Sequence, residues 1–406
     1  RRGGRQVEGE ANGRVIKILK TVEPVAGNDL ELTLDLDLQL TAEKMLQGKE
    51  GAVVAMDPNN GDILVMASNP TFDQNDFIGG ISNKKWQTLV TDPGKPMNNK
   101  AIQAEYPPAS TYKILTTIAA LEEKHVDLST TAFCPGHYNF GNRTYKCWRW
   151  KLGGHGEVDV IEALAQSCDV FYYQAGDKIG VDPLAQYAMG SGFGKKTGVI
   201  LENERKGLIP TSGWKRKRFK ESWQGGETLS IAIGQGYNLV TPLQLSVFVA
   251  AVGNGGTLYR PRIVKTITNS DNQIVKKIEP EITGGLPASP ETLQIVKKAL
   301  FEVVQGERGT ARNYARIKGV EVAGKTGTAQ VFSRKKGEIL DTEDLVYELR
   351  DHAWFVSYAP ADNPVIAVSV IIEHGEHGSS GAAPIARAVM ENYLGRLGLI
   401  NEESEK

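Results

Sequence analysis

The chain has 406 residues, of which 40% are hydrophobic and 23% charged, a balance that excludes a largely disordered, collagenous or disulfide-scaffold protein. Its 47 Lys and Arg residues are offset by 48 Asp and Glu residues, so the formal net charge is −1. Because proteins that mainly bind nucleic acid carry a basic excess, this charge argues against that class.

The hydropathy of the chain and its first residue indicate whether a membrane-spanning segment is present and whether the chain is a fragment. No apolar run approaches the roughly 18 residues that span a bilayer. The most apolar run, residues 365–372, predicts a buried strand. The chain begins at Arg1 rather than Met, so we interpret it as a fragment of a longer protein.

The first third of the chain predicts a linker, a strand and a hairpin. Residues 1–28 are rich in Gly and charged side chains, and we interpret them as a linker or the end of a preceding domain. Leucines alternate from Leu30 to Leu40, which predicts a half-buried strand whose last residues already enter a helix. Residues 51–57 and 62–68 are apolar and flank the turn sequence PNNG, which predicts a β-hairpin.

The rest of the chain predicts a helical middle followed by strands. Residues 110–250 show the helical spacing of apolar residues. Three strands are predicted over 320–332, 352–360 and 364–373, and a closing helix over 383–394. We therefore predict an α+β fold, in which one antiparallel sheet is covered by helices and carries an inserted all-α subdomain.

The sharpest local feature is the sequence YPPASTYK. Its two prolines precede a helix rather than lie within one, so Ser110 falls at a helix N-terminus and Lys113 lies one turn later on the same face. A nucleophilic serine needs a neighbouring base and an electropositive cradle, and this arrangement offers both. The alternative is that Ser110 is only a helix cap, because S-x-x-K recurs by chance in proteins of this size.

Two further motifs strengthen the nucleophile interpretation. Ser167-Cys168-Asp169 and Lys325-Thr326-Gly327 follow Ser110 in the chain. The motifs S-x-x-K, S-D-N and K-T-G occur together, in this order, in β-lactamases and penicillin-binding proteins.

The chain therefore resembles the penicillin-binding transpeptidases. Five longer stretches are similar to the class B enzymes of that family: 51–68, 99–110, 229–245, 322–330 and 352–360. The resemblance is closest to the cell-elongation group, the penicillin-binding proteins 2, and covers residues 29–400. It implies the transpeptidase fold shared with serine β-lactamases over residues 29–406. Residues 1–28 would be the remnant of a non-catalytic N-terminal pedestal domain.

The resemblance implies a serine-type D,D-transpeptidase that cross-links peptidoglycan stem peptides during cell elongation and is acylated by β-lactams. Ser110 would attack the carbonyl of the penultimate D-alanine, and Lys113, in its neutral form, would take the Ser110 proton. Ser167 would pass a proton to the leaving D-alanine. The backbone N–H groups of Ser110 and Thr328 would form the oxyanion hole. The substrate-binding residues would be Lys325, Thr326, Gly327 and Thr328. Of these, Lys325, Thr326 and Thr328 would hold the terminal carboxylate of the substrate.

Asp169 departs from the commonest family pattern, which has Asn at this position, whereas the elongation enzymes resemble S-x-D. A carboxylate there would hold Lys113 by hydrogen bonding. It would also favour the charged form of that lysine, which works against a neutral base. The role of Asp169 stays open between these two effects.

The resemblance also implies the cellular setting. It implies no cofactor for catalysis and no nucleic-acid partner. Stem peptides would be the substrate, β-lactams the inhibitors, and a membrane glycosyltransferase and other elongation-complex proteins the partners. The protein would face the periplasm at the bacterial cytoplasmic membrane, and its single N-terminal anchor would be missing from this fragment.

Three alternative functions stay open. A D,D-carboxypeptidase would use the same residues but pass the acyl group to water. A β-lactamase or β-lactam sensor would share the motifs, with Glu202 as its candidate deacylating residue. A scaffold within a cell-wall complex is the non-enzymatic alternative. Stable covalent labelling by a fluorescent penicillin would separate most of these.

Two patterns outside the motifs receive simpler interpretations. A second K-T-G sequence, at 196–198, follows a glycine-rich turn, and we prefer the copy that begins at Lys325 because it lies among alternating apolar residues. The basic run 215–218 predicts a solvated surface loop, with contact to an anionic lipid or wall polymer as the alternative.

The last candidate site is a set of three cysteines and one histidine: Cys134, Cys147, His155 and Cys168. Three thiols and one imidazole suit a tetrahedral zinc ion with a structural role. His137 is a substitute for His155 in this set. Two other interpretations stay open, a disulfide with one free thiol and three unrelated buried cysteines. Because Cys168 lies within the second motif, zinc would stabilise the loop that carries Ser167 and Asp169.

Overall fold

The computed structural model describes residues 3–331 and 346–400 of the chain. The outer ends of the two predicted segments, 1–28 and 29–406, therefore lie in part outside the described residues. So does residue 332, the last of the strand predicted over 320–332.

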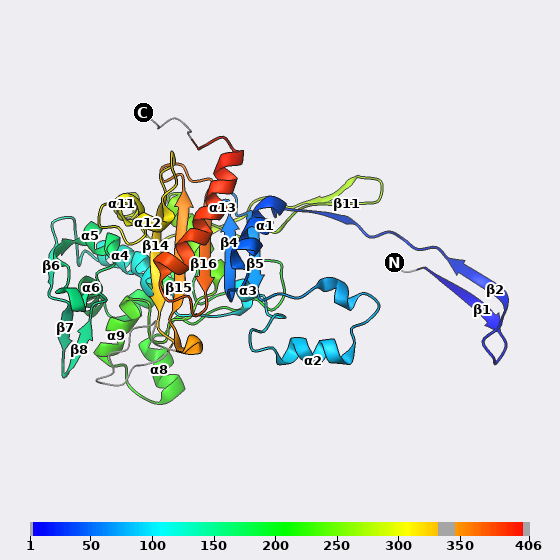
Figure 1. Ribbon diagram of the computed structural model, residues 1–406, viewed down its shortest axis with the longest axis horizontal. Helices are drawn as coiled ribbons and strands as arrows, with labels where there is room; N and C mark the ends of the chain where they lie inside the picture. The colour runs from blue at the N-terminus through cyan, green and yellow to red at the C-terminus, as the bar shows by residue number, and fades with distance from the viewer. Residues whose placement is uncertain (1–2, 332–345, 401–406) are drawn as a thin grey trace.

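A five-stranded antiparallel sheet forms the centre of the molecule (Figure 1). In spatial order its strands are β14 (Ala323–Ala329), β15 (His352–Ala359), β16 (Ile366–Ile372), β4 (Gly51–Met56) and β5 (Ile63–Asn69). The pairing of β4 with β16 joins the first and last thirds of the chain. The predicted hairpin and the predicted antiparallel sheet are confirmed.

The sheet is buried on both faces. In β4, Ala52 and Val54 enter one hydrophobic core, whereas Val53 and Ala55 enter a second core on the opposite face. Successive strand side chains point to opposite faces, so a strand that is covered on both faces reads as a continuous apolar run. This explains why residues 365–372 show no alternation.

Helices cover each face of the sheet. On one face lie α1 (Leu36–Leu46) and α13 (Ala383–Arg396), and α13 crosses in front of the strands in Figure 1. On the other face lies α10 (Pro242–Gly253), which packs against β4 and β16 and is almost entirely buried. The predicted closing helix is confirmed as α13.

The alternating leucines of the first third divide between a strand and a helix. The strand β3 (Asp29–Leu32) is short, and α1 begins at Leu36 with the Asp35 side chain accepting the N–H of Leu38. Leu38 is buried, whereas Leu36 and Leu40 are exposed. The predicted entry of this segment into a helix is confirmed. The prediction of a half-buried strand was wrong, because β3 is exposed and because α1 buries every fourth residue rather than every second.

The predicted helical middle, residues 110–250, is confirmed and is part of a longer region between β5 and β14 that contains most of the described helices. Its helices are α2 (Asn83–Thr91), α3 (Lys100–Gln103), the 3₁₀ turn η2 (Ala109–Tyr112), α4 (Lys113–Glu122), α5 (Val160–Ala165), α6 (Asp169–Ile179), α7 (Val181–Gly190), α8 (Ser212–Phe219), α9 (Gly225–Ala232), α10, α11 (Pro290–Gln305) and α12 (Arg312–Ala315).

Small sheets interrupt this helical region, and the sequence did not predict them. Between α4 and α5 lie β6 (Thr131–Cys134) paired with β9 (Gly156–Asp159), and β7 (His137–Phe140) paired with β8 (Arg143–Lys146). Farther along, β11 (Val264–Thr268) pairs with β3 and β12 (Ile274–Lys277), and β10 (Thr257–Tyr259) pairs with β13 (Ile282–Gly285). These strands have three to five residues each, too few for a period-two pattern to stand out.

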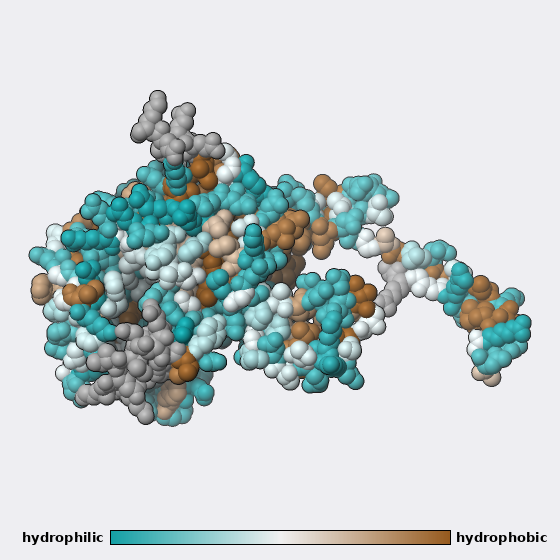
Figure 2. Space-filling model, viewed as in Figure 1, coloured by the Kyte–Doolittle hydropathy of each residue, from teal (hydrophilic) through white to brown (hydrophobic). Residues whose placement is uncertain are grey.

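The predicted linker at the start of the chain contains a β-hairpin. Strands β1 (Gly4–Gly9) and β2 (Val15–Val22) pair with each other and stand apart from the body of the molecule (Figure 1). Figure 2 shows hydrophobic side chains on this hairpin, where Ile16 and Leu19 are exposed. That it belongs to a preceding domain stays a prediction. None of the described helices has the length and hydrophobicity needed to cross a bilayer.

Candidate active site

Ser110 lies in the 3₁₀ turn η2, directly before α4, as the YPPASTYK sequence predicts. The preceding residue, Ala109, has a φ of 50°, and its N–H donates to the carbonyl oxygen of Gly234 at 2.8 Å. Gly234 has a φ of 73°, and a Cβ there would lie 2.1 Å from the Ala109 carbonyl oxygen. The loop between α9 and α10 therefore fixes the turn that presents Ser110.

The first and second motifs meet at the buried amine of Lys113. Its Nζ lies 2.6 Å from Oδ1 of Asp169, 3.0 Å from the carbonyl oxygen of Ser167 and 3.2 Å from the Ser167 hydroxyl. Ser167 has a φ of 57°, a left-handed conformation that is unusual for a non-glycine residue. These contacts bring the first motif, which contains Lys113, against the second motif, although the two are far apart in the sequence.

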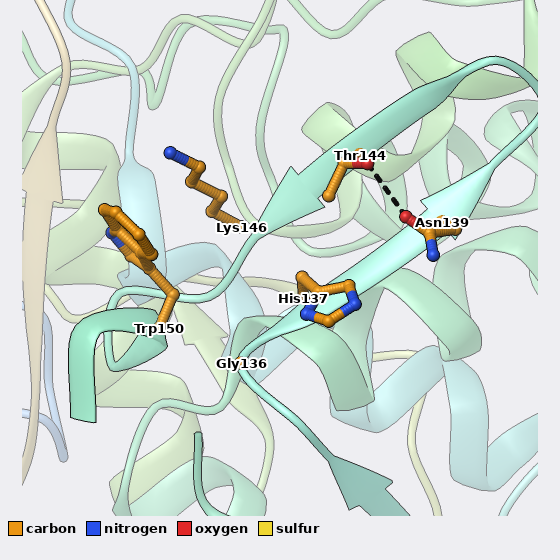
Figure 3. Close-up of a pocket in the computed structure, with 6 residues that line it drawn as sticks. All are labelled: Gly136, His137, Asn139, Thr144, Lys146 and Trp150. Atoms are coloured by element: carbon orange, nitrogen blue, oxygen red, sulfur yellow. Dashed lines mark hydrogen bonds between the residues drawn. The ribbon is translucent and has the colours of Figure 1, made fainter. Parts of the chain in front are cut away.

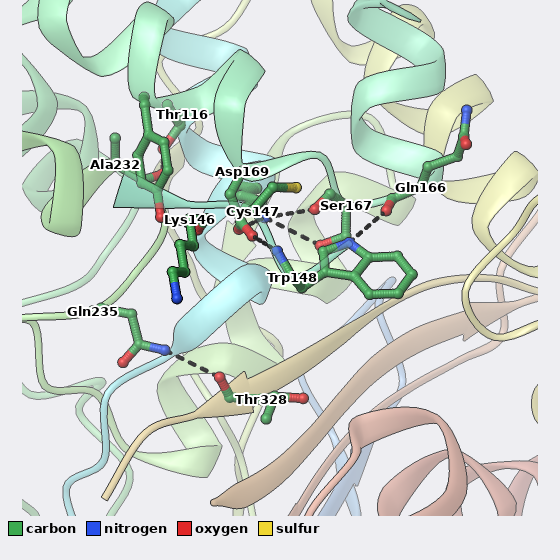
Figure 4. A network of polar contacts seen from close by, with 12 residues as sticks. Thr116, Lys146, Cys147, Trp148, Gln166, Ser167, Asp169, Ala232, Gln235 and Thr328 are labelled. Carbon is green, nitrogen blue, oxygen red and sulfur yellow. Dashed lines mark hydrogen bonds and ion pairs between the residues drawn. The ribbon is translucent and has the colours of Figure 1, made fainter. Parts of the chain in front are cut away.

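The carboxylate of Asp169 uses both oxygens. While Oδ1 accepts from Lys113, Oδ2 accepts the backbone N–H of Trp148 at 2.8 Å (Figure 4). Burial raises the pKa of Asp169, although the positive charge of Lys113 and both hydrogen bonds act in the opposite direction. Asp169 therefore connects the Lys113 amine, on α4, to the backbone at Trp148.

The third motif lies on β14, and its lysine is fully buried. The ammonium of Lys325 donates to the carbonyl oxygen of Thr326 at 3.0 Å. Burial and the positive charge of Lys113 hold the pKa of Lys325 well below its usual range, while the charge of Asp169 raises it in part. Two amines and one carboxylate thus share the same buried space.

Close packing holds β14 against the Ser110 turn. A Cβ on Gly327 would lie 3.2 Å from the Thr111 methyl and 3.3 Å from the Pro108 carbonyl oxygen. Opposite Gly327 on β15, the buried Trp354 donates its indole N–H to the Pro107 carbonyl oxygen at 3.0 Å. Gly327 therefore lets β14 pack tightly against the turn, and a Cβ at this position would require its neighbours to shift.

Thr328 and Thr326 have partners that sequence reasoning did not identify. Gln235, from the loop that holds the Ser110 turn, donates to the Thr328 carbonyl oxygen at 3.0 Å (Figure 4). The hydroxyl of Thr310 lies 2.8 Å from that of Thr326. The only sequence signal for Thr310 is its neighbour Gly309, where a Cβ would lie 2.4 Å from two carbonyl oxygens of α11.

The second K-T-G sequence lies in a turn outside this site. There the backbone N–H and the hydroxyl of Thr197 both donate to Glu204. The basic run lies in helix α8 rather than in the predicted loop, and Lys215 is buried against Glu227 at 2.6 Å. The remaining basic residues of the run are exposed, as a solvated surface predicts.

The predicted cysteine and histidine set comes together in space. The ligand atoms of Cys134, Cys147, His155 and Cys168 all lie within 4.8 Å of one another, and the three cysteines are free and buried. Nδ1 of His155 lies 3.6 Å from the Cys134 sulfur and 3.5 Å from the Cys147 sulfur. His137 instead lines a pocket beside this cluster (Figure 3).

A family described as "Penicillin binding protein transpeptidase domain" matches residues 51–391. "Peptidoglycan D,D-transpeptidase MrdA" of Haemophilus influenzae is 40% identical over 397 residues, which cover 97% of this chain and 60% of that relative. The chain thus spans about three fifths of the length of this curated relative.

Two solved structures share the fold of the chain. Pseudomonas aeruginosa PBP2 in complex with WCK 5153 superposes with a TM-score of 0.82 at 37% identity, covering 95% of this chain and 82% of that one. The complex between PBP2 and MreC from Helicobacter pylori gives a TM-score of 0.82 at 34% identity, covering 98% and 69%. The predicted fold is confirmed.

The close approach at Gly234 predicts a site-specific loss of stability. Gly234→Ala should lower the free energy of unfolding by about 2–4 kcal/mol, because it adds a clash with Ala109 to the cost of a left-handed conformation. Gly255→Ala is the matched control, since Gly255 has a φ of 87° and nothing within 4 Å of a Cβ. It should cost about 1 kcal/mol. Equal losses in urea denaturation would contradict the proposed constraint.

Proposed function

Because the chain belongs to the family of penicillin-binding protein transpeptidase domains, we propose that it is a peptidoglycan D,D-transpeptidase acting through an acyl-enzyme on Ser110. The observation that carries this proposal is the buried amine of Lys113, at the start of the helix that follows Ser110. This amine contacts both Ser167 and Asp169. β-Lactams would acylate the same serine.

In the proposed reaction, Ser110 Oγ bonds to the carbonyl carbon of the penultimate D-alanine while Lys113 takes the hydroxyl proton. The backbone N–H groups of Ser110 and Thr328 stabilise the oxyanion, a contribution of a few kcal/mol at the transition state. As the peptide bond breaks, Ser167 passes its hydroxyl proton to the amine of the leaving D-alanine and receives in exchange the proton that Lys113 took from Ser110, across the 3.2 Å contact between Lys113 Nζ and Ser167 Oγ. An amine from a neighbouring stem peptide then displaces Ser110 from the ester, and the proton from that amine returns to Ser110.

The substrate carboxylate has three proposed hydroxyl and ammonium partners on β14: Lys325, Thr326 and Thr328. The hydroxyl of Thr310 supports this assignment, because its hydrogen bond restricts the rotation of the Thr326 hydroxyl. Glu202, the candidate deacylating residue of a β-lactamase, is exposed.

We also propose a structural zinc ion at Cys134, Cys147, His155 and Cys168. With Zn–S near 2.3 Å and Zn–N near 2.0 Å, tetrahedral geometry places each sulfur about 3.5 Å from the imidazole nitrogen. The two sulfur-to-nitrogen distances, 3.6 and 3.5 Å, fit this value. Zinc would stabilise the base of the β7–β8 hairpin and the second motif, and the acyl transfer itself would need no metal.

The setting of the protein is proposed from its relatives. The Helicobacter pylori relative forms a complex with MreC, and we propose a partner of the same kind for this chain. A membrane glycosyltransferase would supply the nascent glycan, and the domain would face the periplasm at the cytoplasmic membrane.

Acylation at Ser110 is tested by intact-mass spectrometry with benzylpenicillin. The unmodified chain should gain one penicilloyl adduct, and Ser110→Ala should gain none while remaining folded, because this substitution costs about 1 kcal/mol or less. A full-occupancy adduct on Ser110→Ala would overturn the assignment.

The two buried lysines should differ in their response to arginine. Lys113→Arg should slow acylation by about 10³-fold, since arginine stays charged near neutral pH and cannot accept the serine proton. Lys325→Arg should keep measurable acylation, because carboxylate binding needs only a cation. Stopped-flow acylation by a chromogenic cephalosporin measures both, and equal rates would refute this division of roles.

Zinc is tested by elemental analysis of protein purified without added metal or chelator. We expect about one zinc per chain, lost together with several degrees of Tm in His155→Ala. His137→Ala is the control, since His137 lies outside the cluster, and it should keep both. A zinc content well below one with a cysteine crosslink in the mass spectrum would favour the disulfide instead.

A further inference from the structure

The outward face of the β7–β8 hairpin forms an open pocket of about 380 Å³ (Figure 3). Its lining consists of Gly136, His137, Asn139, Thr144, Lys146 and Trp150. The cross-strand pairs of the hairpin are His137 with Lys146 and Asn139 with Thr144, so these four side chains share one face. We call this feature the hairpin pocket.

The hairpin pocket offers hydrogen-bond donors and a cation, and its lining contains no carboxylate. The ammonium of Lys146 lies 3.8 Å from the centre of the Trp150 ring and forms no ion pair with another described residue. The Thr144 hydroxyl donates to the Asn139 side-chain oxygen at 2.8 Å, which leaves the Asn139 amide NH₂ to bind a ligand. An anionic oxygen group is the ligand that complements this lining.

The hairpin pocket is joined to the second motif through the backbone. The carbonyl of Lys146 accepts the hydroxyl of Tyr173 from α6 at 3.1 Å. Two residues later, Trp148 donates its backbone N–H to Asp169 and its indole N–H to the Gln166 carbonyl oxygen at 3.1 Å (Figure 4). The Trp148 side chain is held this way although it is 54% exposed. The short segment from Lys146 to Trp148 therefore links the hairpin pocket to the second motif.

We propose that the hairpin pocket binds a free carboxylate of the stem peptide, at a residue that precedes the D-Ala–D-Ala end. This inference rests on the proposed transpeptidase function and specifies its substrate. The terminal carboxylate has its own partners on β14, so the hairpin pocket would recognise a second carboxylate within the same peptide. The site would therefore discriminate between stem peptides with a free carboxylate and those in which that group is an amide.

The test compares two synthetic pentapeptides ending in D-Ala-D-Ala. They differ only at the third residue, whose side chain carries a carboxylate in one and the corresponding amide in the other. Each peptide competes with a fluorescent penicillin for the unmodified chain, and the concentration that halves the labelling rate is measured. We expect the carboxylate peptide to be about fivefold more effective, the upper end for one exposed ion pair.

Lys146→Met should abolish this preference and leave the rate of penicillin labelling unchanged, which also shows that the variant is folded. Asn139→Asp, which places a carboxylate in the pocket, should abolish it as well. Lys217→Met, at an exposed position on α8, is the control and should retain it. Equal competition by the two peptides, or an unchanged preference in Lys146→Met, would overturn the inference. Absence of penicillin labelling in the unmodified chain would instead overturn the proposed function.

Discussion

The buried ion pair between Lys113 and Asp169 is the interaction on which the arrangement of the site depends. Burying either charge alone would cost several kcal/mol, so each requires the other, and the 2.6 Å contact fixes α4 against α6. The second oxygen of Asp169 extends the constraint to Trp148 and thereby to the β7–β8 hairpin. One carboxylate thus positions the proposed base, Lys113, together with the second motif and the flank of the site.

Glycines supply a second constraint, at the positions where separate segments touch. Gly234 lets the α9–α10 loop accept the backbone of Ala109, and Gly327 lets β14 lie against the Ser110 turn. Trp354 closes the same contact from the neighbouring strand by bonding Pro107. Backbone contacts therefore fix the segments that carry the polar side chains of the site. Such preorganisation is what the proposed acyl transfer would require.

Much of the site could be predicted because its residues stand in short, ordered motifs. Lys113, Ser167 and Asp169 contact one another, and the charges of Lys113 and Asp169 act on Lys325. The catalytic and binding roles of these residues and of Ser110 stay predictions. Thr310 and Gln235 could not be predicted, because their parts depend on which backbone groups fold beside them. The three cysteines and His155 were predicted as a candidate zinc site from their residue types. The short strands that bring them together were not predicted, because they are too short to leave a periodic pattern.

The fold was predictable where an apolar or turn pattern was long or distinctive, and less so where the pattern covered only a few residues. The continuous apolar run of β16 and the PNNG turn between β4 and β5 each left a distinct signal. By contrast, Leu36 and Leu40 extended an alternating pattern into a helix whose buried face passes through Leu38. Over so few residues the same apolar pattern is compatible with one turn of a helix or with a short strand. Only tertiary contacts then determine which of the two forms.

The register between β4 and β16 has a consequence for how the protein is made. It pairs Val54 with Ser369, residues from opposite ends of the domain. Until β16 has left the ribosome, the strand that will separate β4 from β15 is missing. The nascent chain therefore cannot order β14 and β15 on the sheet beside the serine turn. Contacts of such long sequence separation also slow folding. The proposed ability to be acylated at Ser110 should consequently arise late, and all at once, after nearly the whole domain has been synthesised.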